Sequence, residues 1–217
     1  MTAATALDEL QLLAQQLSGS MQKTILPPNL AYHWLTRGSY QIAYRLLCLE
    51  GVSSTVTTAG TAAYTLPDDF LKVISVVYDD NMLTELDHAL VSYVDTNQAT
   101  PSNYVIQHPE AIRLYPIPDA IKNLYIHYYR RPATISADGD SIDLPEELAQ
   151  LCVEYAVWRL YQTFQPELAP MMWETFQANF KMHEKTAERQ VTSQIVSPKD
   201  DFFGGEWIEP RMAIIID

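Results

Sequence analysis

The sequence predicts an α+β protein, in which a helical bundle carries an inserted small antiparallel β-sandwich or barrel and an extended C-terminal tail. Apolar residues recur at helical spacing before residue 51 and again after residue 143. Between residues 53 and 132 the period shortens toward two, and β-branched and tyrosine side chains become frequent. Residues 196–217 combine chain breakers with large apolar side chains, which is unusual for a disordered tail.

Two helices are expected before the strands. The first covers residues 5–17, with Thr5 as its cap and Asp8 three residues later. The second runs from about residue 30 to residue 50, and Gly51 is expected to stop it. Its buried stripe consists of Leu35, Ile42, Ala43, Leu46 and Leu49.

Short strands separated by proline-marked turns are expected in the middle of the chain. They cover residues 54–58, 62–66, 71–79, 83–86, 104–107, 111–115 and 123–131. A short helix over residues 87–95, capped by Asp87, is expected between two of them. Short antiparallel strands of this kind favour a small sandwich or a partly closed barrel.

Two further helices are expected after the strands. Asp143 and Glu146 form a capping box for the third helix, and Pro166 suits the first turn of the fourth, which extends to about residue 189. The stripe of the third is Leu148, Leu151, Cys152, Tyr155 and Trp158, and that of the fourth is Ala169, Met172, Trp173, Phe176 and Phe180.

These elements suggest three parts of the chain. Residues 1–51 and 136–195 form one discontinuous helical domain, because helices that flank an insertion pack together. Residues 52–135 form the inserted β domain, and residues 196–217 form an extended C-terminal arm.

The charge of the chain argues against a protein that grips nucleic acid. The formal net charge is −13, and residues 136–217 hold fifteen acidic and six basic side chains. Such a surface does not neutralise phosphates, which supply most of the affinity of proteins for DNA. No membrane span or secretory signal is expected. Cys48 and Cys152 lie in helical patterns and are expected to be buried, reduced thiols of a protein made in the cytoplasm.

No pattern of residues indicates catalysis, a metal or a cofactor. Residues 138–149 fail as a calcium-binding loop, since Asp143 replaces the required glycine and Ala149 the final glutamate. The five histidines have no metal-ligand spacing, and no phosphate-binding glycine loop occurs. The carboxylate doublets at residues 68–69 and 79–80 are interpreted as turn and strand-end residues, because neighbours on a strand point to opposite faces. We therefore expect no enzyme.

Five motifs occur in a fixed order between residues 64 and 147. They are Y-T-L-P-D-D-F at residues 64–70, T-P-S-N-Y at 100–104, I-R-L-Y-P-I-P-D at 112–119, L-Y-I-H-Y-Y-R-R-P at 124–132 and L-P-E-E at 144–147. In this order they resemble the head-to-tail adaptors, or connectors, of tailed bacteriophages. The resemblance covers roughly residues 30–190.

The resemblance implies a structural virion protein of the head–tail neck. Proteins of that family form a homo-oligomeric, usually dodecameric, ring beneath the portal protein. The ring extends the channel through which duplex DNA passes without specific binding, and it docks the tail or the next neck protein. The chain is thus expected in the virion after its synthesis in the host cytoplasm.

Three groups of residues are candidates for this role. Portal or neighbour binding is assigned to the apolar residues of the tail: Phe202, Phe203, Trp207, Ile208, Met212, Ile214, Ile215 and Ile216. A tail or partner interface is assigned to a tyrosine-rich strand, because tyrosine and arginine are favoured in interfaces: Tyr125, Tyr128, Tyr129, Arg130 and Arg131. Channel lining is assigned to acidic residues of the helices: Glu154, Glu174, Glu184 and Glu188.

Two alternatives come from other classes of protein. One is a carbohydrate- or receptor-binding β-sandwich module of a virion, such as a fibre-attachment protein, and the other is a small hydrolase. The helices at both ends argue against the first, since a free-standing sugar-binding module does not need them.

Overall fold

The computed structural model describes residues 1–18, 26–87, 97–107 and 111–195, and in the last helix it describes side chains as far as residue 185. Within these residues two helices, α1 (Ala3–Ser18) and α2 (Pro28–Leu46), precede seven strands. Two further helices, α3 (Glu146–Phe164) and α4 (Ala169–Ile195), follow the strands. The strands are β1 (Glu50–Val56), β2 (Ala63–Thr65), β3 (Phe70–Tyr78), β4 (Asn81–Glu85), β5 (Asn103–Gln107), β6 (Ala111–Tyr115) and β7 (Asn123–Arg130). The predicted α+β class is confirmed.

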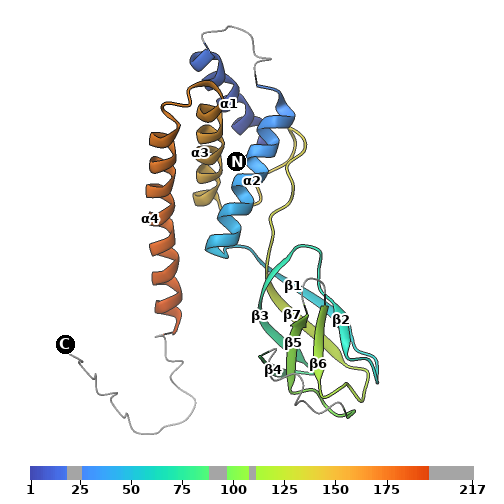
Figure 1. The fold of residues 1–217 in the computed structure, drawn as a ribbon. Helices are drawn as coiled ribbons and strands as arrows, with labels where there is room; N and C mark the ends of the chain where they lie inside the picture. The colour runs from blue at the N-terminus through green and yellow to red at the C-terminus, as the bar shows by residue number, and fades with distance from the viewer. Residues whose placement is uncertain (19–25, 88–96, 108–110, 196–217) are drawn as a thin grey trace, which may run out of the picture.

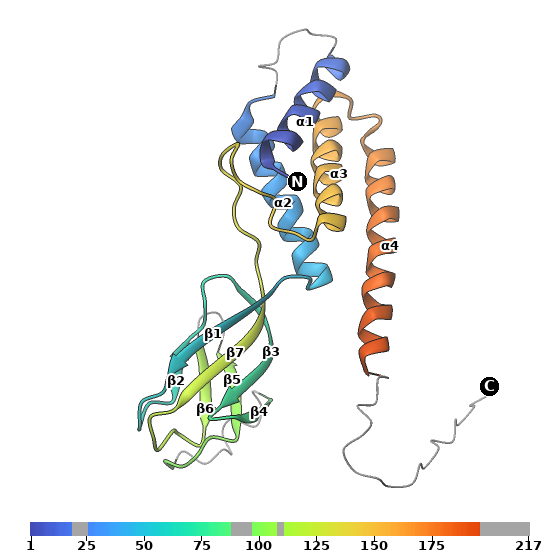
Figure 2. The same ribbon diagram turned by 180° about the vertical axis from the view of Figure 1, so that it is seen from behind.

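The helices and the sheet lie at opposite ends of the molecule (Figures 1 and 2). Helices α1, α2 and α3 pack together, and α4 lies along α3 on the outside. Each part has its own core. The helical core is centred on Leu10, Leu35 and Cys152, and the core of the sheet on Val76, Leu114 and Ile126. The division of the chain into domains stays a prediction.

Both N-terminal helices have ends that differ from the prediction. Helix α1 begins at Ala3, and Thr2, not Thr5, is its capping residue, because its hydroxyl accepts the backbone N–H of Thr5 at 3.3 Å. Helix α2 ends at Leu46, because Leu47 adopts a left-handed conformation (φ 48°) and its N–H closes the last turn on the carbonyl of Ala43. Gly51 is therefore no helix stop.

The strands form one curled sheet in the order β1-β7-β3-β4-β5-β6-β2. The expectation that all neighbours are antiparallel is wrong at one place, since β4 pairs with β5 in parallel through Thr84 and Asn103. Strand β1 starts at Glu50, earlier than the predicted residue 54, so that it pairs with β7 along its whole length. The helix expected over residues 87–95 lies almost wholly outside the described residues.

The doublet Asp79–Asp80 forms the two-residue loop between β3 and β4. Both residues have positive φ, 46° and 66°, as a type I′ turn requires, and Tyr78 pairs with Asn81 across the loop. The interpretation of this doublet as a turn is confirmed.

The third and fourth helices also begin differently from the prediction. Asp143 does not cap α3, which starts at Glu146 behind Pro145 with no side-chain cap. Helix α4 starts at Ala169 and packs through Phe176 and Phe180, which are buried. Trp173, expected in the buried stripe, is 37% exposed and packs against Trp158 at the edge of the core, with ring centroids 4.4 Å apart and the rings tilted by 41°.

Helices α2 and α3 approach each other closely at Gly38. A Cβ atom at this position would lie 3.1 Å from the backbone oxygen of Cys152 and 3.1 Å from the ring of Tyr155. Glycine therefore permits the close crossing that lets the Cys152 thiol donate to the carbonyl oxygen of Leu35 at 2.9 Å. Burial raises the pKa of the Cys152 thiol to about 12.

Candidate interaction surfaces

The tyrosine-rich strand β7 has two different faces. Tyr125 and Tyr129 lie on one face together with the paired residues Ser54 and Glu50 of β1. Tyr128 lies on the opposite face, where it is 6% exposed and packs against Phe70. Only the first face can meet a partner, because Tyr128 belongs to the core of the sheet.

Tyr128 is held in place by one residue of the sequence motifs and by a glycine of β1. The Tyr128 hydroxyl donates to the carboxylate of Asp69 at 2.9 Å. Asp69 of the L-P-D-D-F motif therefore has a structural role through its side chain, which binds another side chain and not only backbone groups. A Cβ atom on Gly51, the residue paired with Tyr128 on β1, would lie 3.0 Å from the Tyr128 ring. Glycine at this strand position therefore makes room for the ring.

The two arginines of the predicted interface are engaged within the subunit. Arg130 donates two hydrogen bonds to the carboxylate of Asp143, at 2.6 and 3.0 Å, and the backbone N–H of Ala133 donates to the same carboxylate at 3.0 Å. The pKa of Asp143 is lowered by the hydrogen bonds from Arg130. Arg131 donates to the backbone oxygen of Asp68.

The contact with Asp143 assigns Arg130 to the junction between the two parts of the protein, whereas Arg131 binds a residue of the sheet part. Arg130 ends β7, which lies between β1 and β3 in the sheet, and Asp143 lies in the segment that leads into α3. A bidentate pair of this kind fixes relative orientation as well as adding energy. We therefore count Tyr125 and Tyr129, but not the arginines, as candidates for contact with a partner.

The four glutamates expected to line a channel have different surroundings. Glu154 is half-buried and accepts hydrogen bonds from the Asn179 amide at 3.0 Å, and Glu184 lies 3.7 Å from the Arg45 guanidinium. Glu174 is exposed on α4. Glu188 lies in α4, but its side chain is outside the described part of the structure. Of the four, only Glu174 is fully available in the described structure.

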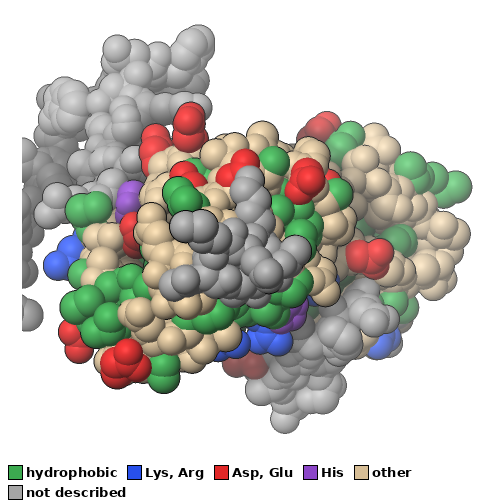
Figure 3. All heavy atoms as spheres, turned by 90° about the horizontal axis from the view of Figure 1, so that it is seen from above, with side chains coloured by type: hydrophobic (Ala, Val, Ile, Leu, Met, Phe, Trp, Pro, Cys, Tyr) green, Lys and Arg blue, Asp and Glu red, His purple; other side chains and the backbone are tan. Residues whose placement is uncertain are grey.

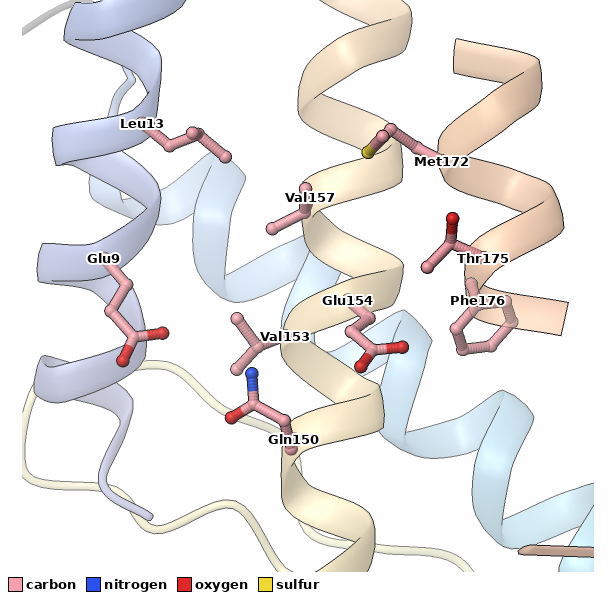
Figure 4. Close-up of a pocket in the computed structure, with 9 residues that line it drawn as sticks. All are labelled: Glu9, Leu13, Gln150, Val153, Glu154, Val157, Met172, Thr175 and Phe176. Carbon is pink, nitrogen blue, oxygen red and sulfur yellow. The ribbon is translucent and has the colours of Figure 1, made fainter. Parts of the chain in front are cut away.

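A groove that the sequence did not predict runs between α1, α3 and α4 (Figure 4). It has a volume of about 230 Å³ and is walled mainly by apolar side chains, among them Leu13, Val157 and Met172. Glu9 and Glu154 line it as well, and no lysine or arginine does. The signal in the sequence is weak, because residues from three separate helices form the groove.

The outer face of α2 has the opposite charge. The sequence of α2 contains Arg37 and Arg45 but no aspartate or glutamate, and His33, Arg37 and Tyr44 are exposed. Figure 3, which looks along the helices, shows acidic side chains on several sides of this end of the molecule and a few basic ones at its left and lower edges. The outer face of α2 and the groove thus differ in charge.

Other kinds of site find little support in the described part of the chain. It holds no group of three or more His, Cys, Asp or Glu side chains that could bind a metal ion. None of its helices combines the length and apolar character needed to cross a bilayer. The apolar residues of the tail that were assigned to portal binding lie outside the described residues.

Comparison with known proteins agrees with the motifs. No curated protein matches the chain. A model of the family described as "SU10 adaptor protein" matches residues 1–198, which include the helices and the whole sheet. The resemblance drawn from the five motifs is confirmed, and the chain belongs to the SU10 adaptor family, a family of phage head-to-tail adaptors.

Proposed function

We propose that the protein is a structural subunit of the phage neck that forms a dodecameric ring beneath the portal, extends the DNA channel and docks the tail or the next neck protein. The observation that carries the proposal is the family match, which spans both the helical bundle and the sheet. The role requires no catalysis and no cofactor.

The outer face of the sheet supports a docking role. Among the described strands β1 lies at one edge of the sheet, and the first face of β7 adjoins it. Val52 and Val56 on β1 are 61% and 57% exposed, and Tyr125 lies on the same face. Apolar side chains beside an unpaired strand edge are typical of a surface that receives another protein. We assign this surface, with Tyr129, to the tail or neck partner.

The acidic character of the chain supports passage of DNA without adhesion. With a net charge of −13, a ring of these subunits repels the phosphate backbone over a Debye length of about 8 Å at physiological salt. Glu174 is the best placed of the four glutamates to face the lumen, because Glu154 and Glu184 bind groups of their own subunit.

The C-terminal segment is proposed to anchor the ring to the portal. Residues 196–217 carry Phe202, Phe203 and Trp207 between chain breakers. Each large apolar side chain stabilises a complex by roughly 1.5–3 kcal/mol when it is fully buried. A chain that ends at residue 195 is expected to keep the fold but to lose stable attachment to the portal, and unchanged attachment would refute the anchor.

The function is tested by mixing the full-length chain with purified portal rings. Light scattering and negative-stain imaging are expected to show a second ring on one end of the portal. A chain that stays monomeric and leaves the portal bare contradicts the proposal. If that monomer also binds glycans on an array, the alternative of a carbohydrate- or receptor-binding module replaces it.

A further inference from the structure

The two charged faces of the helical bundle lie on opposite sides of it. Helix α2 meets α3 through Leu35, Gly38 and Cys152. At 100° per residue, His33, Arg37 and Tyr44 lie about 160–200° around α2 from Leu35, so they face away from α3.

The groove faces the other way. Gln150, Glu154 and Val157 lie about 140–200° around α3 from Cys152, the residue that meets α2. Figure 4 looks into the groove between α1, α3 and α4, with α2 passing behind α3. The exposed stripe of α2 and the groove therefore point in nearly opposite directions.

The two faces are complementary in charge and in character. The groove carries the carboxylates of Glu9 and Glu154 on apolar walls, whereas the stripe carries Arg37, His33 and Tyr44. Among the described residues neither Arg37 nor Glu9 has an ion-pair partner in its own subunit, and both are exposed. An apolar groove in which the carboxylate of Glu9 has no ion-pair partner among the described residues suits a helix with arginine and aromatic side chains.

Arg37 and Glu9 also lie at similar positions along the axis of the bundle. Helices α2 and α3 run in opposite directions (Figure 1), and Gly38 stands level with Cys152. Arg37 is therefore near the level of Val153, beside which Figure 4 shows Glu9. In a ring whose axis runs along the helices, each helix keeps its height in every copy, so Arg37 of one copy comes level with Glu9 of the next.

We propose that the outer stripe of α2 docks into the α1–α3–α4 groove of a neighbouring copy, with Arg37 paired to Glu9, and that this is the contact between subunits in the ring. The proposal deepens the proposed function and rests on it. Different patches on opposite sides of one subunit give a head-to-tail contact, which closes into a ring when the rotation allows. The occupant of the groove is thus a second copy of this chain.

A charge-swap series in the full-length chain tests the contact. Arg37→Glu and Glu9→Lys are each expected to raise the dissociation constant for self-association about tenfold in sedimentation velocity, since each places like charges together. The double variant is expected to return to within about threefold of the wild type. Lys72→Glu is the matched control, because Lys72 is an exposed cation on β3 that belongs neither to the α2 stripe nor to the groove. All variants are first shown to melt like the wild type.

Cross-linking identifies the occupant of the groove. In a chain with His33→Cys and Leu13→Cys, oxidation is expected to give a ladder of linked oligomers, and mass spectrometry is expected to place the bond between α1 and α2 of different copies. A groove cysteine that links instead to residues 196–217 or to another protein overturns the proposal, and so does the absence of any α1–α2 link. If rings still form on the portal without this link, the inference fails and the proposed function stands. If the link forms but no ring caps the portal, the contact survives and the proposed function fails.

Discussion

Breaking the pair between Arg130 and Asp143 is expected to destabilise the protein at the junction between sheet and bundle. The two side chains are 28% and 26% exposed and are joined by two hydrogen bonds, so water screens them only in part. Hydrogen bonds to charged groups contribute about 1.5–3 kcal/mol each when one partner is removed. Asp143→Ala also leaves the N–H of Ala133 without its acceptor. We expect a loss of about 2–3 kcal/mol in the free energy of unfolding.

A double-mutant cycle separates the pair from these other losses. Arg130→Met keeps the packing of the aliphatic stem, Asp143→Ala removes the carboxylate, and the cost at Ala133 cancels between the two branches of the cycle. Urea unfolding of the four proteins, followed by circular dichroism, is expected to give a coupling energy of about 1.5 kcal/mol. The same cycle on Lys122 and Asp79, an exposed pair at 2.8 Å, is expected to show no measurable coupling.

The result that refutes this reasoning is a coupling energy at Arg130 and Asp143 no larger than that of the exposed pair. The bidentate pair would then stabilise the folded protein no more than a surface ion pair does. The orientation of the sheet on the bundle would depend on the connecting backbone alone.

Three further predictions concern single residues. The pKa of Asp143 is lowered in the folded protein, so its contribution to stability is fully present above the unfolded pKa of about 3.9 and is lost as the pH falls through the folded pKa. In urea titrations the difference in stability between the wild type and Asp143→Asn is therefore expected to be constant from about pH 5 to 7 and to shrink below about pH 4. Gly51→Val is expected to lower the free energy of unfolding by about 1–3 kcal/mol, measured by thermal unfolding, because the valine side chain would meet the Tyr128 ring. Gly139→Val is the control and is expected to leave the melting temperature unchanged, since a Cβ at residue 139 meets open space. Equal effects of the two substitutions would contradict the close contact at Gly51. The Cys152 thiol, with its pKa raised to about 12, is expected to react with Ellman's reagent only at the rate of unfolding, and fast labelling in the native protein would show that it is not buried.

Much of the local structure follows from the sequence. The turn at Asp79–Asp80 and the strand 111–115 depend on neighbouring residues, and their prediction is confirmed; the structure adds that the turn has the positive φ angles of type I′. The motifs between residues 64 and 147 were enough to indicate the adaptor family, because they preserve a fixed order of turns and strands.

Ends of elements were predicted less well, since distant partners decide them. Asp143 has the residue type and position of a helix cap, yet its carboxylate binds Arg130, which the pairing of β7 brings to it. Gly51 has the residue type of a helix stop, but β1 extends across it because β7 offers a partner and the ring of Tyr128 needs its space.

Only the tertiary structure decided which charged and aromatic residues are free to meet another protein. The alternation of β7 separates Tyr125 and Tyr129 from Tyr128, but a sequence does not say which of the two faces is covered. The groove of Glu9 and the stripe of Arg37 likewise exist only once three helices pack around α3, because a surface is set by contacts between residues far apart in the chain.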